Sequence, residues 1–170
     1  HSTIFGMDDM DTRAFSSFLE KRNCVCIVKT HPMSPEFAEE TRSERVMVWK
    51  DHDLRTRGIS LYEMVGASDL LITDASSVYV DYLMLDKPVI IAFPDLDEYR
   101  RSRGFALEPV EDFFAGPVVS NYSELTEAIA QSLRADKYAA DRARLAKSFH
   151  KHRDAGATAR LLEAVLPDPR

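Results

Sequence analysis

The sequence predicts an α/β fold, in which helices cover both faces of a parallel sheet. Two observations predict this fold. Short β-branched apolar runs alternate with stretches whose apolar residues repeat at helical spacing, and the runs are continuously apolar, as in strands buried on both faces. At 170 residues the chain can bury one sizeable core, and no internal repeat or low-complexity tract divides it. We therefore expect a single domain over residues 1–170.

The first half of the chain alternates between predicted helices and strands. Phe15, Phe18 and Leu19 repeat at helical spacing and predict a helix over Asp11–Arg22. Further helices are expected over 34–43, which is acidic at its start and basic at its end, and from Ser60 onward. The charged segment Lys50–Gly58 has no apolar period and is expected to be a loop at the edge of the sheet. The apolar runs predict strands over Cys24–Thr30, Val46–Trp49 and Leu70–Thr73.

The second half continues the alternation. Ser76 and Ser77 open a helical pattern that runs through Leu85, and Ser123 is expected to cap an amphipathic helix. The segment 94–116 is long and has little periodicity, which indicates either a functional loop or an unrecognised element. Strands are expected over Val89–Phe93 and Pro117–Ser120, and C-terminal helices from about 137, over 137–149 and 155–165.

The composition excludes several classes of protein. Apolar residues make up 45% and charged residues 29% of the chain, which is typical of a globular protein. Acidic residues outnumber basic ones by 28 to 22, for a net charge of -6, which argues against nucleic-acid binding. A small anionic ligand remains compatible with this charge, because a local cluster of side chains can oppose the global sign.

Cysteine usage and hydropathy indicate a cytoplasmic protein. Cys24 and Cys26 alternate along a predicted apolar strand, so buried reduced thiols are favoured over a disulfide or half of a metal site. No apolar run is near the roughly 18–20 residues needed to span a bilayer, and the N-terminus shows no signal-peptide pattern. Any membrane contact is therefore expected to be peripheral.

Asp74, Ser76 and Ser77 stand where a predicted strand ends and a predicted helix begins. Ligands of open α/β sheets bind at this edge, and the unpaired N–H groups of a helix start favour an anion. The hypothesis is that Ser76 and Ser77 hold a phosphate and that Asp74 belongs to the same phosphate-binding site. The alternative is that one serine only caps the helix and that Asp74 only accepts from backbone N–H groups.

Other polar residues of the predicted edge have competing interpretations. His31 precedes Pro32 at the end of a strand, where it either is structural or acts on a phosphoryl group. Arg100, Arg101 and Arg103 are candidates for a phosphate clamp, or else belong to a solvated loop paired with neighbouring acids. His150 and His152 are expected to face solvent, and nothing indicates a role for His52.

The common motifs of nucleotide and hydrolase chemistry are absent from the sequence. It has no G-x-G-x-x-G after the first predicted strand, no P-loop and no G-x-S-x-G elbow. No spacing of His, Cys, Asp or Glu predicts a metal site. The residues themselves therefore predict an α/β domain that binds a phosphorylated small molecule.

Several blocks in a fixed order nevertheless resemble a known family. They are Lys29-Thr-His31-Pro32, Ser68 to Val78 with Asp81, Asp86-Lys87-Pro88, Asp95-Leu-Asp97-Glu-Tyr99, Arg103-Gly104-Phe105 and Gly116-Pro117. Together they resemble the C-terminal domain of the CDP-glycerol:poly(glycerophosphate) glycerophosphotransferases, which build teichoic acids and related capsule polymers. Ala75 stands where these proteins usually have tyrosine. The matching blocks run from about residue 25 to residue 130.

The resemblance implies a GT-B architecture of two Rossmann-like halves, of which this chain is the C-terminal, donor-binding half. It implies transfer of glycerol phosphate from CDP-glycerol, or a related CDP-polyol, to a polyol-phosphate polymer acceptor. His31 matches a histidine that stabilises the transferring group, and Ser76 and Ser77 match a pyrophosphate-binding pair. The loop with Asp95, Asp97, Arg103 and Gly104 would lie near the donor.

The same resemblance implies partners and a location. An N-terminal GT-B half would complete the active site, and the full-length protein would lie at the inner face of the plasma membrane. No cofactor is predicted, and whether Mg²⁺ assists is left open. The alternatives are a GT-B sugar transferase or epimerase that uses a UDP-sugar, and a non-catalytic nucleotide-binding module.

Overall fold

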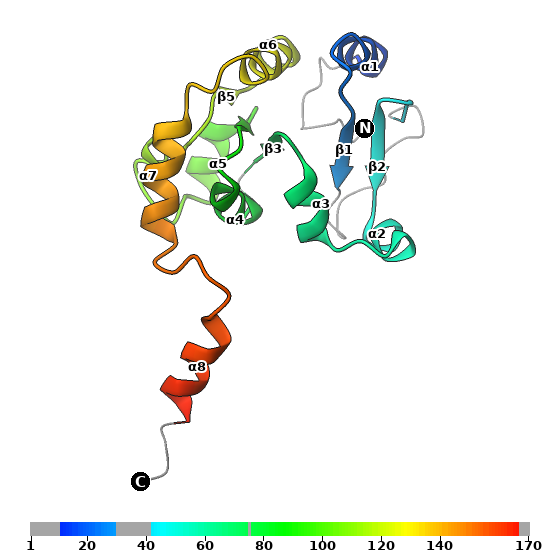
Figure 1. The fold of residues 1–170 in the computed structure, drawn as a ribbon. Helices are drawn as coiled ribbons and strands as arrows, with labels where there is room; N and C mark the ends of the chain where they lie inside the picture. Colours follow the sequence, from blue (N-terminus) through cyan, green and yellow to red (C-terminus); the bar gives the residue numbers. More distant parts are fainter. Residues whose placement is uncertain (1–10, 30–41, 75, 167–170) are drawn as a thin grey trace.

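All strand pairs in the described part of the chain are parallel. A computed structural model describes residues 11–29, 42–74 and 76–166. In these residues β1 (Cys26–Lys29) pairs with β2 (Val46–Trp49), and a second sheet has the order β3 (Leu71–Thr73), β4 (Val89–Ala92), β5 (Val118–Val119). The parallel α/β fold predicted from the sequence is thus confirmed (Figure 1).

Helices connect and cover these strands. The α-helices are α1 (Thr12–Glu20), α2 (Asp51–Arg57), α3 (Leu61–Ala67), α4 (Val78–Tyr82), α5 (Leu96–Ser102), α6 (Tyr122–Ser132), α7 (Ala139–Phe149) and α8 (Ala157–Val165). The described residues also form the short 3₁₀ segments η3 (Leu83–Leu85) and η4 (Val110–Phe113). No helix in the described part of the chain is long and apolar enough to cross a membrane.

Strand β4 shows why the helices occupy both faces. Its residues are all buried, and alternate side chains point to opposite faces of a strand. Ile90 and Ala92 belong to an apolar cluster with residues of α1 and α6, whereas Val89 and Ile91 belong to a second cluster with residues of α4 and α7. Figure 1 shows α1 and α6 side by side above the strands, where the rings of Phe15 and Tyr122 meet edge to face.

The segment Lys50–Gly58, predicted to be a loop, is helix α2 and its two caps. The carboxylate of Asp53 accepts a hydrogen bond from the backbone N–H of Lys50 at 2.8 Å, which closes the first turn. Gly58 ends the helix with φ at 65°, a conformation that glycine adopts without strain. Only Leu54 is buried, so the helix carries no apolar period that the sequence could show.

The irregular segment predicted over 94–116 contains α5 and η4. Acidic residues lie in the first turn of α5 and basic residues in its last turn, as the helix macrodipole favours. None of its residues is buried, although the ring of Tyr99 packs against Phe93 with centroids 5.2 Å apart. An exposed helix of this kind shows weak apolar periodicity, which is why the sequence did not reveal it.

Two further local predictions are corrected. Helix α6 is capped by Asn121, whose side chain accepts from the N–H of Glu124 at 3.0 Å, and Ser123 lies inside the helix. Both cysteines are free but only half-buried, and Cys24 lies before β1, not within it. Burial raises the pKa of the Cys26 thiol to about 12, which favours the protonated form at neutral pH. The helix predicted over 34–43 falls mostly outside the described residues.

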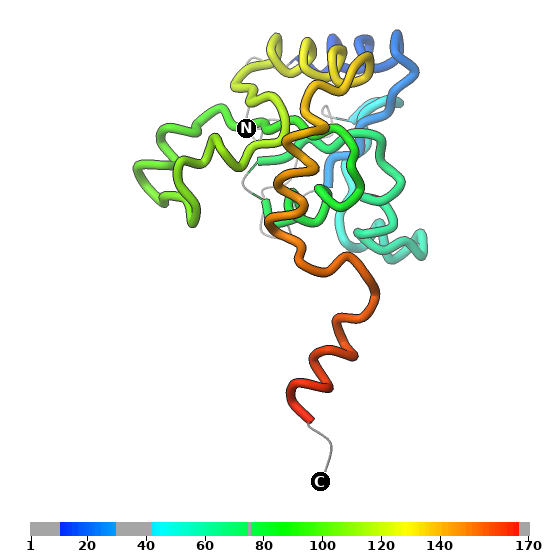
Figure 2. The backbone as a smooth tube through the Cα atoms, turned by 60° about the vertical axis from the view of Figure 1, so that its left-hand side comes forward, coloured from blue at the N-terminus to red at the C-terminus, as the bar shows by residue number. Residues whose placement is uncertain are grey.

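Helix α7 is joined to the opposite edge of the sheet, where the strands begin. Arg142 is 1% exposed, and its guanidinium donates to Asp136 at 2.7 Å and to the Asp86 carboxylate at 3.1 Å. A cavity of about 100 Å³ lies beside Arg142, lined also by Val89 and Pro117. After α7 the chain leaves the body, and α8 extends away from it without a buried residue (Figure 2).

Candidate functional site

Asp74, Ser76 and Ser77 lie at the carboxyl edge of the β3–β4–β5 sheet. Strand β3 ends at Thr73, α4 begins at Val78, and all three polar residues between them are exposed. Ser77 occupies the N-cap position with helical φ and ψ, and its side chain makes no capping hydrogen bond. The capping alternative is therefore wrong for Ser77, whose hydroxyl is available to a ligand.

Helix α4 is held against the sheet by two tyrosines. Tyr79 is 9% exposed and Tyr82 is fully buried, and both belong to the cluster that packs on Val89 and Ile91. The backbone N–H of Tyr79 donates to the carbonyl of Ser76 at 3.1 Å, so the first turn includes the serine pair. The buried face of α4 thus fixes where its exposed start lies on the edge.

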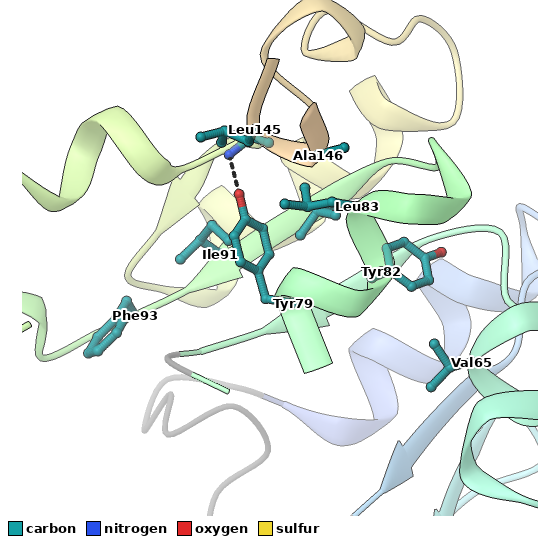
Figure 3. Packing of buried hydrophobic residues seen from close by; sticks show 10 residues of the cluster. Val65, Tyr79, Tyr82, Leu83, Ile91, Phe93, Leu145 and Ala146 are labelled. Carbon is teal, nitrogen blue, oxygen red and sulfur yellow. Dashed lines mark hydrogen bonds between the residues drawn. The ribbon is translucent and has the colours of Figure 1, made fainter. Parts of the chain in front are cut away.

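The hydroxyl of Tyr79 has two backbone partners in a distant segment. It donates to the carbonyl oxygen of Phe113 at 2.7 Å. It also accepts from the N–H of Ala115 at 2.8 Å, the bond drawn as a dashed line in Figure 3. Burial raises the pKa of Tyr79 to about 12, so the hydroxyl keeps its proton at neutral pH. Sequence reasoning missed this contact, because a tyrosine at helical spacing shows only that it is apolar and large.

His150, predicted to face solvent, is half-buried at the end of α7. Its Nε2 lies 2.8 Å from the carbonyl oxygen of Val80 on α4. The ring therefore links the end of α7 to α4, and the polar sequence around it hides this contact. His152 is exposed as predicted.

Asp95 and Asp97 follow β4 at the same edge as Asp74. Strands β3 and β4 are neighbours in parallel register, with Thr73 beside Ile91, so the residues after each strand emerge together. Asp95 is the N-cap of α5 and Asp97 lies in its first turn. The structure thus brings these carboxylates and the serine pair to one edge.

Arg103 and Gly104 lie at the far end of α5. A helix rises about 1.5 Å per residue, which places them roughly 12 Å along the axis from Asp95. The guanidinium of Arg103 lies 5.7 Å from the ring centroid of Tyr99, and Gly104 has φ at 71°. The four residues predicted as one donor loop are therefore spread along a helix.

Arg100 pairs with acidic side chains, as the second of its two interpretations predicted. Its guanidinium pairs with Glu111, with Glu108 at 3.7 Å and with Asp97 at 3.8 Å. The hydrogen bond from Arg100 holds the pKa of Glu111 below its ordinary value. The guanidinium of Arg100 is therefore paired with carboxylates, and these ion pairs link α5 to η4.

The remaining predicted site residues lie beyond what the structure describes or away from the edge. His31 and Ala75 fall outside the described residues, which reach Lys29 before the gap at 30–41. His52 lies on the exposed surface of α2. Within the described ranges, no group of three His, Cys, Asp or Glu side chains is placed to hold a metal ion.

Comparison with known proteins shows a consistent set of relatives. A family model described as CDP-Glycerol:Poly(glycerophosphate) glycerophosphotransferase matches residues 2–167. The teichoic acid ribitol-phosphate primase of Bacillus spizizenii is 32% identical over 127 residues, which are 75% of this chain and 31% of the relative. The teichoic acid poly(glycerol phosphate) polymerase of Bacillus subtilis is 43% identical over 70 residues, 41% of this chain and 9% of the relative.

Solved structures show the same fold. The H444N variant of the wall teichoic acid polymerase TagF superposes with a TM-score of 0.75 at 19% identity, over 96% of this chain and 39% of TagF. Another TagF structure, obtained after a soak with CDPG, gives a TM-score of 0.57 at 16% identity, over 88% of this chain and 45% of that one. The chain spans about a third of the length of the ribitol-phosphate primase that it resembles. It belongs to the CDP-glycerol:poly(glycerophosphate) glycerophosphotransferase family.

Proposed function

We propose that this chain is the donor-binding half of an enzyme that transfers glycerol phosphate, or a related polyol phosphate, from a CDP-linked donor. The observation that carries the proposal is the family match over nearly the whole chain. The relatives include enzymes named for ribitol phosphate and for glycerol phosphate, so both polyols are candidates. The acceptor would be a growing teichoic-acid-like or capsule polymer, and a second, N-terminal half would bind it.

In this reaction a terminal hydroxyl of the acceptor attacks the β-phosphorus of the donor. The bond between that phosphorus and the oxygen bridging to the α-phosphate breaks, CMP leaves with the bonding electrons, and the hydroxyl proton passes to a base or to solvent. Charge develops on the transferring group and on the leaving phosphate, so catalysis depends on positioning and on hydrogen-bond donors. Hydroxyl donors and a protonated histidine suit that task.

Ser76 and Ser77 are the proposed ligands of the donor diphosphate. Both are exposed at the edge where ligands of parallel sheets bind, and the Ser77 hydroxyl is not used to cap the helix. Asp74, predicted to belong to the phosphate-binding site, shares this edge with Asp95. An ionised carboxylate only accepts hydrogen bonds, so the proposal now assigns both residues to the hydroxyls of the polyol or ribose. His31 is the proposed group at the transferring phosphoryl.

The nucleotide preference of this chain tests the proposal. In calorimetric titrations we expect CDP-glycerol or CDP-ribitol to bind at least tenfold more tightly than UDP-N-acetylglucosamine, with CMP as a reference for the nucleotide alone. Tighter binding of the UDP-sugar would move the protein to the sugar-transferase interpretation. Absence of binding to any cytidine ligand would contradict a donor site within this chain.

Replacing both serines tests the phosphate ligands. We expect Ser76→Ala combined with Ser77→Ala to weaken donor binding by roughly 10-fold to 100-fold, since each of two solvent-exposed hydrogen bonds contributes about 0.5–1.5 kcal/mol net and about 1.4 kcal/mol corresponds to tenfold in affinity. Both side chains are exposed, so the thermal unfolding temperature should stay within about 2 °C of wild type. Exposed Ser123 on α6, changed to alanine, is the control. Unchanged donor affinity in the double variant would rule the pair out.

We further propose that the full-length protein acts at the cytoplasmic face of the plasma membrane, where it would meet a lipid-linked or polymeric acceptor. The free thiols of Cys24 and Cys26 fit a reducing compartment. Fractionation of cells into cytosol and plasma membrane would test this location. A peripheral protein should be found with the membrane and should be released by a high-salt wash.

A further inference from the structure

We infer that Tyr79 is a positioning residue for the donor site: its hydroxyl fixes the start of α4, and thereby the place of Ser76 and Ser77 on the edge. The inference rests on the proposed function in one respect, that the serine pair binds the donor. It adds a residue that does not itself touch the donor. The link runs from the exposed serines, through one buried hydroxyl, to a segment more than thirty positions away in sequence.

The near end of this link is short and direct. Tyr79 is two residues past Ser77, and its N–H donates to the Ser76 carbonyl at 3.1 Å, so the tyrosine and the serine belong to one turn. Helix α4 has five residues, too few for its own hydrogen bonds to hold it in place. Its position therefore depends on side-chain contacts.

The segment at residues 113–117, which holds the Tyr79 hydroxyl, is itself held tightly against strand β4. Ala115 is fully buried, and the next residue, Gly116, packs so closely on β4 that a Cβ atom there would lie 1.9 Å from the Val89 carbonyl oxygen. The N–H of Ile91 donates to the Pro117 carbonyl at 2.9 Å. The segment that holds the Tyr79 hydroxyl is thus locked to the central strand, and the hydroxyl transfers that rigidity to the start of α4.

Both sides of the Tyr79 hydroxyl are used. It gives its proton to the Phe113 carbonyl and receives the Ala115 N–H, at distances of 2.7 and 2.8 Å. Phenylalanine would keep the ring in the cluster but leave a buried N–H and a carbonyl without this partner. The segment or the helix would then shift to find other partners, and the serines would move with α4.

Tyr82 on the same helix supplies a matched control. It is also buried in the cluster, but its hydroxyl lies 3.1 Å from the hydroxyl of Ser68, at the end of α3. The two rings leave α4 in different directions, as Figure 3 shows. Tyr82→Phe therefore removes one buried hydroxyl from α4 without touching the link between Tyr79 and residues 113–115.

Hydrogen exchange measures the link independently of any ligand. We expect Tyr79→Phe to increase amide exchange at least tenfold in peptides covering Ser76–Val80 and 113–115, and Tyr82→Phe to leave exchange there within about twofold. Equal exchange in the two variants would overturn the inference, whether or not the chain binds a donor.

Donor affinity then tests the consequence for function. We expect Tyr79→Phe to weaken binding of CDP-glycerol roughly tenfold, because a shift of α4 would lengthen the hydrogen bonds from Ser76 and Ser77, and each such bond contributes about 0.5–1.5 kcal/mol. In the background of Ser76→Ala and Ser77→Ala, the same change should weaken binding less than twofold, because the groups that it positions are gone. A purely structural role predicts equal losses in both backgrounds and would overturn the inference. If wild type and the double serine variant bind donor equally well, Ser76 and Ser77 are not the donor ligands and the proposed function is contradicted at that point. The hydrogen-exchange test of the Tyr79 link remains valid in that case, because it uses no ligand.

Discussion

Changing His31 to alanine should lower the rate of polyol phosphate transfer by about 100-fold to 1,000-fold, while donor affinity stays within about threefold. The size follows from the loss of one hydrogen-bond donor aimed at charge that develops in the transition state. The sequence places His31 two residues past Lys29, the last residue of β1, and the family resemblance assigns it to the transferring phosphoryl group. Single-turnover rates and donor titrations of the full-length enzyme would separate the two effects.

The control for this variant is His52→Ala, because His52 is an exposed histidine on α2 whose Nε2 lies 3.4 Å from the Thr56 hydroxyl. Its transfer rate should equal that of wild type. A His31 variant with normal turnover would end the assignment. A variant that lost donor affinity in proportion to its rate would instead make His31 a binding residue.

Changing Asp136 to asparagine should lower the free energy of unfolding by about 3 kcal/mol, as expected when a buried charge loses a partner. Arg142 is 1% exposed, and among the described residues the one carboxylate left to pair with it would be that of Asp86, whose side chain is 71% exposed. For a chain of this size, the change corresponds to a fall of roughly 6–12 °C in unfolding temperature. Denaturant titration and calorimetry would measure both quantities.

The pH dependence of this effect has a definite sign. The hydrogen bond from Arg142 holds the pKa of the Asp136 carboxyl below its ordinary value. A depressed pKa in the folded state stabilises the protein above the unfolded pKa of about 4, and this stabilisation is lost as the pH falls through the folded value. The difference between wild type and Asp136→Asn should therefore narrow below about pH 4.

Asp141→Asn is the matched control for Asp136→Asn. Asp141 lies on α7 and pairs with Arg144 at 3.6 Å, with both side chains about half exposed, so its loss should change stability by less than about 0.5 kcal/mol. Equal stabilities of the two variants, or a difference from wild type that persists to pH 2, would show that Arg142 does not depend on Asp136.

The strands could be predicted from the sequence because their evidence is local. Strand β4 is four consecutive apolar residues after a proline, and its burial on both faces follows from that run alone. Helices α2 and α5 could not be predicted in the same way. They bury almost nothing, and the evidence for α2 is in its caps, Lys50 with Asp53 at the start and Gly58 at the end.

In the candidate site too, features that depend on local sequence could be predicted, and contacts between distant residues could not. The order of strand, serine pair and helix placed Asp74, Ser76 and Ser77 at the carboxyl edge, and the structure places them there. The contacts that hold this edge join residues far apart in sequence: Tyr79 with Ala115, and His150 with Val80. No local pattern encodes such pairs, because each residue alone resembles an ordinary core tyrosine or surface histidine.

The exposed residues before α4 and the buried strand β4 differ in how strongly the fold restricts their amino-acid identity. Any substitution in β4 disturbs one of the two apolar clusters, because its alternate residues belong to one or the other. Asp74, Ser76 and Ser77 contribute little to the core, so their identities can change at small thermodynamic cost. Under the proposed function, a change of donor at this edge would leave the scaffold the same; the relatives are named for different polyol phosphates.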